Sequence, residues 1–81
     1  MIQFAIRATL HKEGFFEKFS KGEIDACRIY SQAMWEGVND YGDDAPMVTS
    51  LDDVIAIIPG GYVLTYSKDE DIFDVWEQIW S

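Results

Sequence analysis

Apolar and polar residues alternate regularly at the start of the chain. One side of this segment carries only apolar residues, which are Ile2, Phe4, Ile6, Ala8 and Leu10. Because successive side chains of a β-strand point to opposite faces, the alternation predicts a strand over residues 2–10 with one buried and one solvated face. The next segment contains Phe15, Phe16 and Phe19, and we expect these rings to pack in the core rather than to line a ligand site.

The longest segment with a helical repeat spans residues 23–41. The positions of one helical face follow the i, i+3, i+4, i+7 spacing and are Ile24, Cys27, Ser31, Met34, Val38 and Tyr41. Tyr30, Ala33 and Trp35 widen this stripe, and the sequence Gly-Asp-Asp after Tyr41 is a typical helix stop. The pattern predicts one long central helix.

Residues 46–66 fit two interpretations. In the first, the largely β-branched run Val54–Ile58 and the sequence Pro-Gly-Gly before residues 62–66 form a β-hairpin. This hairpin leaves residues 42–53 as a loop that is long for so small a domain.

In the second interpretation, Ser50 caps a helix that has Asp52 and Asp53 in its first turn. Leu51, Val54, Ile55 and Ile58 would then share one helical face. We prefer this interpretation, which predicts a short strand at 46–49, a short helix at 51–58 and a strand at 62–66.

The last segment has the signature of an amphipathic helix. Ser67 followed by Glu70 matches the S-x-x-E capping box, so the predicted helix begins at Lys68 with acids at its positive end. Its apolar arc consists of Ile72, Phe73, Val75, Trp76, Ile79 and Trp80. This arc is wider than a core-facing stripe requires, while Glu70, Asp74 and Glu77 line the outer side.

Together these elements predict a single α+β domain over residues 1–81. Its sheet would have about three short strands, packed with one long central helix and a C-terminal amphipathic helix. A chain of 81 residues suits one domain with a modest core, and twelve aromatic side chains make that core self-supporting without disulfides or metal.

Cysteine usage and hydropathy indicate the compartment. Cys27 is the single cysteine, so no intramolecular disulfide can form, and a reducing environment fits best. The first residues lack the basic leader and apolar core of a signal peptide, and no apolar run approaches the length of a membrane span. We therefore expect a cytoplasmic protein.

The net charge of −9 is distributed unevenly along the chain. Residues 1–28 hold five basic and four acidic side chains, whereas residues 29–81 hold Lys68 against eleven acids. A field of this sign repels phosphate backbones and anionic membranes, so we expect neither direct nucleic-acid binding nor membrane binding. An acidic surface can also serve only to keep a small protein soluble and monomeric.

Catalytic and metal-binding patterns are weak. His11 and Cys27 form the sole nucleophile arrangement on offer, but Cys27 lies on the apolar stripe of the predicted central helix, where thiols are usually buried and inert. One histidine and one cysteine cannot build a structural zinc site, and the acids of residues 39–53 do not match an EF-hand loop in any register. Adventitious weak Ca²⁺ or Mg²⁺ binding at Asp43 and Asp44 is left open. We expect no enzyme, no cofactor and no metal centre.

Recognition of another protein remains as the best-supported class of function. The first hypothesis is a small acidic inhibitor that occupies the basic, nucleic-acid-binding surface of a partner, as a DNA mimic does. Phage or mobile-element inhibitors of CRISPR or restriction systems work in this way, and an immunity protein or antitoxin of a nuclease uses the same physics. The predicted contact residues are Asp43, Asp44, Asp52, Asp53, Glu70, Asp74 and Glu77, together with Trp76 and Trp80.

The second hypothesis is a structural or regulatory adaptor. It would bind through the aromatic edge of the predicted C-terminal helix, because Trp and Tyr are enriched at interface hot spots. In that case the charge would serve solubility alone.

Overall fold

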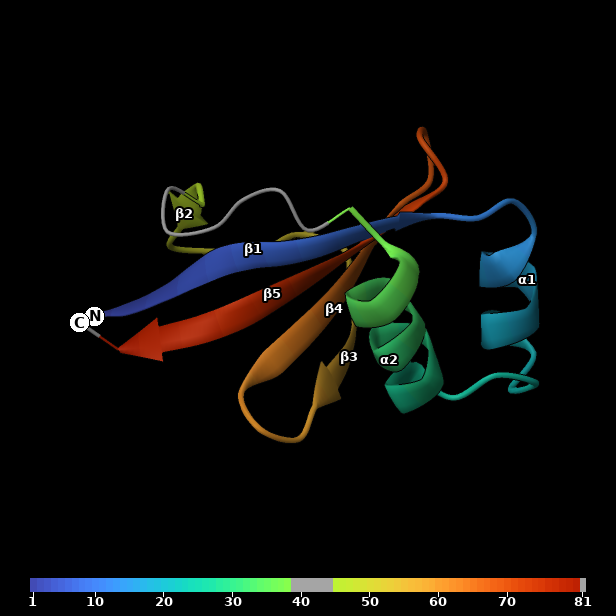
Figure 1. The fold of residues 1–81 in the computed structure, drawn as a ribbon, viewed down its shortest axis with the longest axis horizontal. Helices are drawn as coiled ribbons and strands as arrows, with labels where there is room; N and C mark the ends of the chain where they lie inside the picture. Colours follow the sequence, from blue (N-terminus) through green and yellow to red (C-terminus); the bar gives the residue numbers. More distant parts are fainter. Residues whose placement is uncertain (39–44, 81) are drawn as a thin grey trace.

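A five-stranded antiparallel sheet forms the centre of the protein in residues 1–38 and 45–80, which a computed structural model describes (Figure 1). Its strands are β1 (Ile2–His11), β2 (Met47–Val48), β3 (Val54–Ile58), β4 (Tyr62–Ser67) and β5 (Ile72–Trp80). The order across the sheet is β2-β1-β5-β4-β3, and every neighbouring pair is antiparallel. The last strand in the sequence therefore lies in the middle of the sheet.

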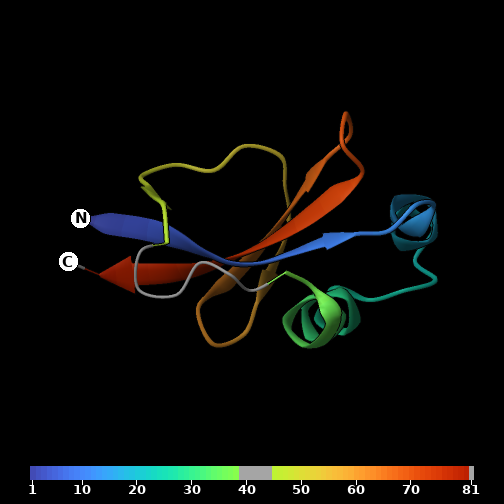
Figure 2. The same cartoon turned by 45° about the horizontal axis from the view of Figure 1, so that its top comes forward.

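Two short helices complete the described fold. Helix α1 (Phe15–Ser20) follows the end of β1, and helix α2 (Ala26–Glu36) lies against one face of the sheet, where it contacts β1, β3 and β5. Figure 2 shows the segment between β2 and β3 on the other side of the sheet from α2. The α+β fold class is confirmed, whereas the sheet is larger and the helices are shorter than predicted.

The main core fills the space between α2 and the sheet. Its buried members are Ala8, Leu10, Phe15, Ile29, Ala33, Leu64, Tyr66, Phe73 and Val75. Phe73 holds the aromatic part together, because its ring centroid lies 5.7 Å from that of Phe15 and 4.9 Å from that of Tyr66. Phe16 stacks on Tyr66 at 4.2 Å, and Phe19 is partly buried against the same cluster. These three phenylalanines thus belong to the core, as the sequence predicts.

The predicted C-terminal helix is wrong, because residues 72–80 form strand β5. Alternate residues explain the difference: Phe73 and Val75 are fully buried under α2, while Asp74 and Trp76 point to the other face. Apolar residues on both faces of a central strand mimic the wide apolar arc of a helix. Ser67 and Glu70, which are predicted to form a capping box, do not cap a helix. Ser67 is the last residue of β4, and Glu70 lies in the turn between β4 and β5.

The preferred helix at 51–58 is also wrong, and the hairpin interpretation is correct. Strands β3 and β4 pair across a turn at residues 59–61, in which Gly60 and Gly61 have φ values of 100° and 90°. These left-handed conformations suit glycine, so local turn chemistry outweighs the helix-capping signal at Ser50. The short strand predicted at 46–49 and the strand predicted at 62–66 correspond to β2 and β4.

The central helix is shorter than the predicted 23–41. It begins after Asp25, whose carboxylate accepts a hydrogen bond of 2.9 Å from the Arg28 backbone N–H, and it ends at Glu36. Its buried residues are Ile29 and Ala33, so the buried face differs from the predicted stripe. Consequently Cys27, predicted to be buried, is exposed, and Trp35 is 88% exposed. Tyr41, predicted to end the stripe, lies outside the described residues.

The predicted first strand is confirmed with one irregularity. The register between β1 and β5 shifts between Ile6 and Ala8, which indicates a β-bulge. Ala8 and Leu10 belong to the main core, whereas Ala5 and Ile6 form a second small cluster with Ala45. Strand β1 therefore contributes buried side chains to both clusters, on either side of the bulge.

Candidate functional site

Strand register brings four chain segments together at one end of the sheet. His11 at the end of β1 pairs with Ile72 at the start of β5, and Ile72 also pairs with Ser67 at the end of β4. Strand β3 begins at Val54, which pairs with Thr65 near the same end. The residues that enter or leave these strands must therefore lie close to one another.

These segments gather carboxylates into what we call the acidic end. Its members are Glu13, Glu17, Asp52, Asp53, Asp69, Glu70 and Asp71. Two adjoining surface hollows connect five of them: one is lined by Glu13, Glu17 and Asp71, and the other by Asp53 and Asp69. Both hollows share the side chains of Phe16, Tyr66 and Lys68. Lys68 is therefore surrounded by carboxylates from the β1–α1 connection, α1, the start of β3 and the β4–β5 turn.

Tyr66 fixes the backbone that carries these acids. Its N–H donates a hydrogen bond of 3.2 Å to the carbonyl of Asp53, and its hydroxyl donates to the carboxylate of Asp71. The hydrogen bond to Asp71, together with burial, raises the pKa of Tyr66 to about 12. Asp53 and Asp71 have φ values of 56° and 54°, a region that aspartate tolerates better than most residues. One core tyrosine thus anchors both turns of the acidic end.

Asp74 extends the acidic end onto the face of the sheet opposite α2. Its Oδ1 accepts a hydrogen bond of 3.0 Å from the Thr9 hydroxyl. Burial raises the pKa of Asp74, and the charge of Glu70 raises it further, while the Thr9 hydrogen bond acts in the opposite direction. Asp74 also lines a small hollow with Asp52 and Asp53 from the loop before β3.

The predicted contact residues therefore divide into groups. Asp52, Asp53, Glu70 and Asp74 are brought together at the acidic end. Glu77 lies further along β5, where its Oε2 accepts a 2.7 Å ion-paired hydrogen bond from Arg7 Nε. Asp43 and Asp44 lie outside the described residues.

The two predicted tryptophans do not form one surface. Trp76 is half-buried, and its indole N–H donates a 2.9 Å hydrogen bond to the Thr65 hydroxyl. Trp80 is 73% exposed and pairs with Ile2 at the end of the sheet opposite the acidic end. The helical aromatic edge on which the adaptor hypothesis rested is not formed.

Sequence reasoning missed four members of the acidic end. Glu13 and Glu17 lie in the charge-balanced first third of the chain, while Asp69 and Asp71 were explained as the acidic start of a helix. The signal that finds them is strand pairing, since an antiparallel sheet places alternate connections at the same end. Because residues 72–80 form a strand between β1 and β4, the connections that carry these acids meet at one end of the sheet.

Residues 1–38 and 45–80 can be compared with the ligand sets of metal sites and with the length of membrane-spanning helices. No three His, Cys, Asp or Glu side chains in these ranges are grouped so that they could hold a metal ion. No helix within them is long and apolar enough to cross a bilayer. Six of the seven carboxylates of the acidic end are exposed, and Asp71 is half-buried.

The chain matches no protein-family model, and neither a curated protein nor a solved structure is similar to it.

Proposed function

We propose that this protein is a binding inhibitor whose acidic end occupies the basic, nucleic-acid-binding surface of a partner protein. The observation that carries the proposal is the gathering of seven carboxylates at one end of the sheet, five of which line the two hollows that contain Lys68. Carboxylates held on a rigid frame attract a basic surface and steer its approach, and they repel nucleic acid itself.

The sign and grouping of these charges support mimicry of a phosphate backbone. The acidic end spans the ends of β1, β5, β4 and β3, and three intervals of about 4.8 Å between adjacent strands give the sheet a width of roughly 14 Å there. Duplex DNA presents a dense row of negative charges, one per about 1.7 Å of axis. A groove built for DNA would therefore meet an excess of negative charge at the acidic end as well.

The anchoring of the acids supports the same proposal. Flexible acidic tails lose conformational entropy when they bind, whereas a preorganised surface loses little. Tyr66 bonds to Asp53 and Asp71, and it packs in the main core through Phe73. The backbone at Asp53 and the carboxylate of Asp71 are thus held in place before a partner arrives.

The test begins with capture of the partner from a nuclease-treated host lysate on the immobilised protein, at about 50 mM salt. We expect a nucleic-acid-binding protein that is released at about 500 mM salt, because salt screens exposed charges. Addition of the free protein should then prevent this partner from binding DNA or RNA. A captured nuclease of the same host would indicate an immunity protein or antitoxin, and a defence nuclease would indicate a phage-type inhibitor.

A matched pair of double variants locates the contact surface. Asp69→Asn with Glu70→Gln removes two charges from the acidic end, and Glu23→Gln with Glu36→Gln removes two exposed charges elsewhere. We expect the first pair to weaken the complex at least tenfold at low salt and the second to change it less than twofold. Equal effects would contradict the proposed surface. A salt-resistant partner with no role in nucleic-acid binding would favour the adaptor hypothesis instead.

A further inference from the structure

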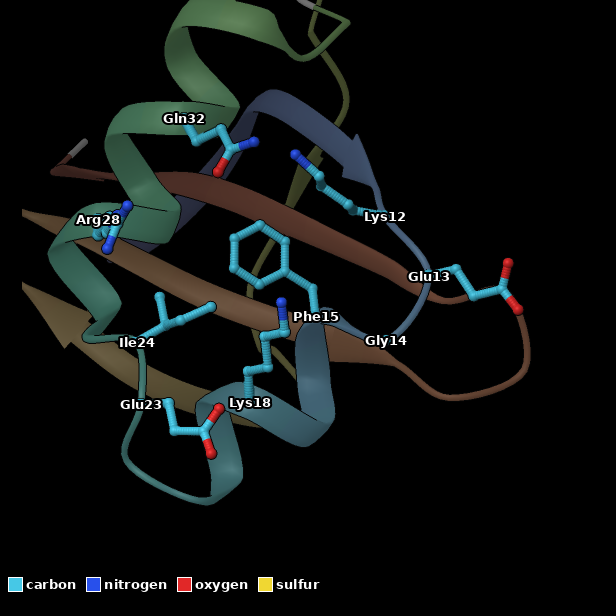
Figure 3. A pocket seen from close by; sticks show the side chains of 9 residues that line it. All are labelled: Lys12, Glu13, Gly14, Phe15, Lys18, Glu23, Ile24, Arg28 and Gln32. Carbon is cyan, nitrogen blue, oxygen red and sulfur yellow. The ribbon is translucent and has the colours of Figure 1, made fainter.

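A further hollow, of ≈ 430 Å³, lies between α1 and α2 (Figure 3). We call it the cationic pocket. Its lining includes Lys12, Phe15, Lys18, Ile24, Arg28 and Gln32. A volume of this order falls within the range of sites that bind small molecules, which is about 300–1,000 Å³.

The pocket concentrates positive charge in an acidic protein. Lys12, Lys18 and Arg28 are three of the six lysines and arginines in the chain, and they come from the β1–α1 connection, α1 and α2. None of the three forms an ion pair with another side chain of residues 1–38 and 45–80. Their charges are thus left for a ligand, although mutual repulsion makes such a cluster unfavourable by itself.

Glu13 and Glu23 lie at the border of this pocket, where their negative charges offset part of the positive charge of its lining. Figure 3 shows the Glu13 carboxylate directed away from the hollow, while Glu23 lies beside Lys18 at the lower rim. Two border acids and a net charge of −9 disfavour a polyanion such as nucleic acid. A compact ligand with one anionic group fits the balance better.

The floor of the pocket is apolar and fixed. Phe15 packs edge-on against Phe73 of the core, and Ile24 lies beside it in the hollow. Lys12 Nζ stands 5.6 Å from the centroid of the Phe15 ring, which is within the range of a cation–π contact. The Glu23 N–H donates a 3.0 Å hydrogen bond to the Lys18 carbonyl and holds the α1–α2 connection in place.

We propose that the cationic pocket binds a small organic anion, in which a phosphate or carboxylate group is joined to an apolar or aromatic body. The anionic group would contact Lys18 and Arg28, with Lys12 and the Gln32 amide as further donors. The apolar body would lie on Phe15 and Ile24. This inference is independent of the proposed function, because it involves no residue of the acidic end except Glu13 at the border.

The test is a titration of ¹⁵N-labelled protein with three probes at constant ionic strength: phenyl phosphate, benzoate and inorganic phosphate. We expect saturable one-to-one binding of at least one aromatic probe, with amide shifts centred on Phe15, Lys18 and Arg28. The tighter aromatic probe identifies the anionic group. Inorganic phosphate should bind at least fivefold more weakly than phenyl phosphate if phosphate is that group.

Charge-removing variants decide whether the pocket is responsible. Lys18→Gln and Arg28→Gln should each weaken the aromatic probe at least fivefold. Lys21→Gln and Lys68→Gln, which remove exposed lysines outside the pocket, should leave the affinity unchanged. Equal losses in all four variants, or no saturable binding of any probe up to about 10 mM, would overturn the proposal. Thermal unfolding of each variant confirms that the fold is retained.

Discussion

The two faces of the sheet use neighbouring residues of the same strands for different purposes. On the face covered by α2, Leu64, Phe73 and Val75 are fully buried. On the other face, polar side chains of neighbouring strands form hydrogen bonds: Asp74 accepts one from Thr9, and Trp76 donates one to Thr65. Burial of large apolar surface makes the covered face the main source of stability. The other face and the acidic end are then free to carry charge that contributes little to folding.

The largest effect is expected at the centre of the covered face. Phe73→Ala should lower the free energy of unfolding by about 3–5 kcal/mol, because it leaves a cavity between the rings of Phe15 and Tyr66. That is a large share of the about 5–15 kcal/mol typical of a whole domain. Trp76→Phe on the other face should cost only about 1 kcal/mol, through loss of the hydrogen bond to Thr65. Urea unfolding measures both, and equal costs would contradict the contrast between the faces.

The next largest effect concerns the attachment of α2 to the covered face. A Cβ atom on Gly37 would lie 2.4 Å from the carbonyl oxygen of Ala33 and 2.6 Å from that of Thr9. Both oxygens accept backbone hydrogen bonds, from Gly37 and Val38, so neither can move freely. Gly37→Ala should therefore cost about 1–3 kcal/mol through overpacking.

Thermal unfolding checks this expectation against Ser31→Ala, an exposed substitution in the same helix that should be nearly neutral. If Gly37→Ala is as harmless as the control, the close approach of α2 to β1 is not required for stability.

The contrast between the faces also explains what the sequence could predict. The sequence of strand β1 alternates clearly between apolar and polar residues, and the predicted 2–10 agrees with Ile2–His11, although the bulge between Ile6 and Ala8 could not be predicted from it. Strand β5 pairs on both edges and carries apolar residues on both faces, so its sequence also fits a helical arc. Propensity cannot separate these alternatives, because the pairing of residues far apart in the chain decides between them.

The candidate site shows the same dependence on pairing. Asp52, Asp53, Glu70 and Asp74 were identified from charge alone, but their convergence follows from the β3–β4–β5 register. The cationic pocket was hidden for a related reason. Lys12, Lys18 and Arg28 lie in a segment whose net charge is close to neutral, and only the placement of α1 across a hollow from α2 collects them.

A smaller and pH-dependent effect is expected where the covered face meets the acidic end. Tyr66→Phe removes the hydrogen bond to Asp71 and should cost about 1 kcal/mol near neutral pH. The pKa of Tyr66 is raised from 10.0 to about 12, so the folded state holds this proton more tightly than the unfolded state. Stability from Tyr66 is therefore fully present below pH 10 and is lost as the pH rises towards 12.

The measurement is urea unfolding of both proteins between pH 8 and pH 11.5. The difference in unfolding free energy should shrink across this interval, and the absorbance of tyrosinate at high pH should lose the contribution of Tyr66 in the variant, while the raised pKa of Tyr30 is kept. A difference that stays constant with pH would contradict the assigned hydrogen bond.

The smallest effect is expected at Asp74, and it has the opposite sign. Burial raises the pKa of Asp74, so the folded state disfavours its charged form and stability falls as the pH rises through its titration. Asp74→Asn keeps an oxygen that can accept from Thr9, and it should stabilise the protein at pH 7 by a few tenths of a kcal/mol. The gain should vanish in acid, where Asp74 is protonated.

Urea unfolding at pH 7 and pH 4 checks the sign, and a destabilised variant at pH 7 would contradict the argument. Under the proposed function, a carboxylate that costs stability where a neutral amide fits serves recognition rather than folding. Asp74→Asn should therefore weaken the partner complex while it strengthens the fold. This opposition distinguishes a functional acidic surface from one that only maintains solubility.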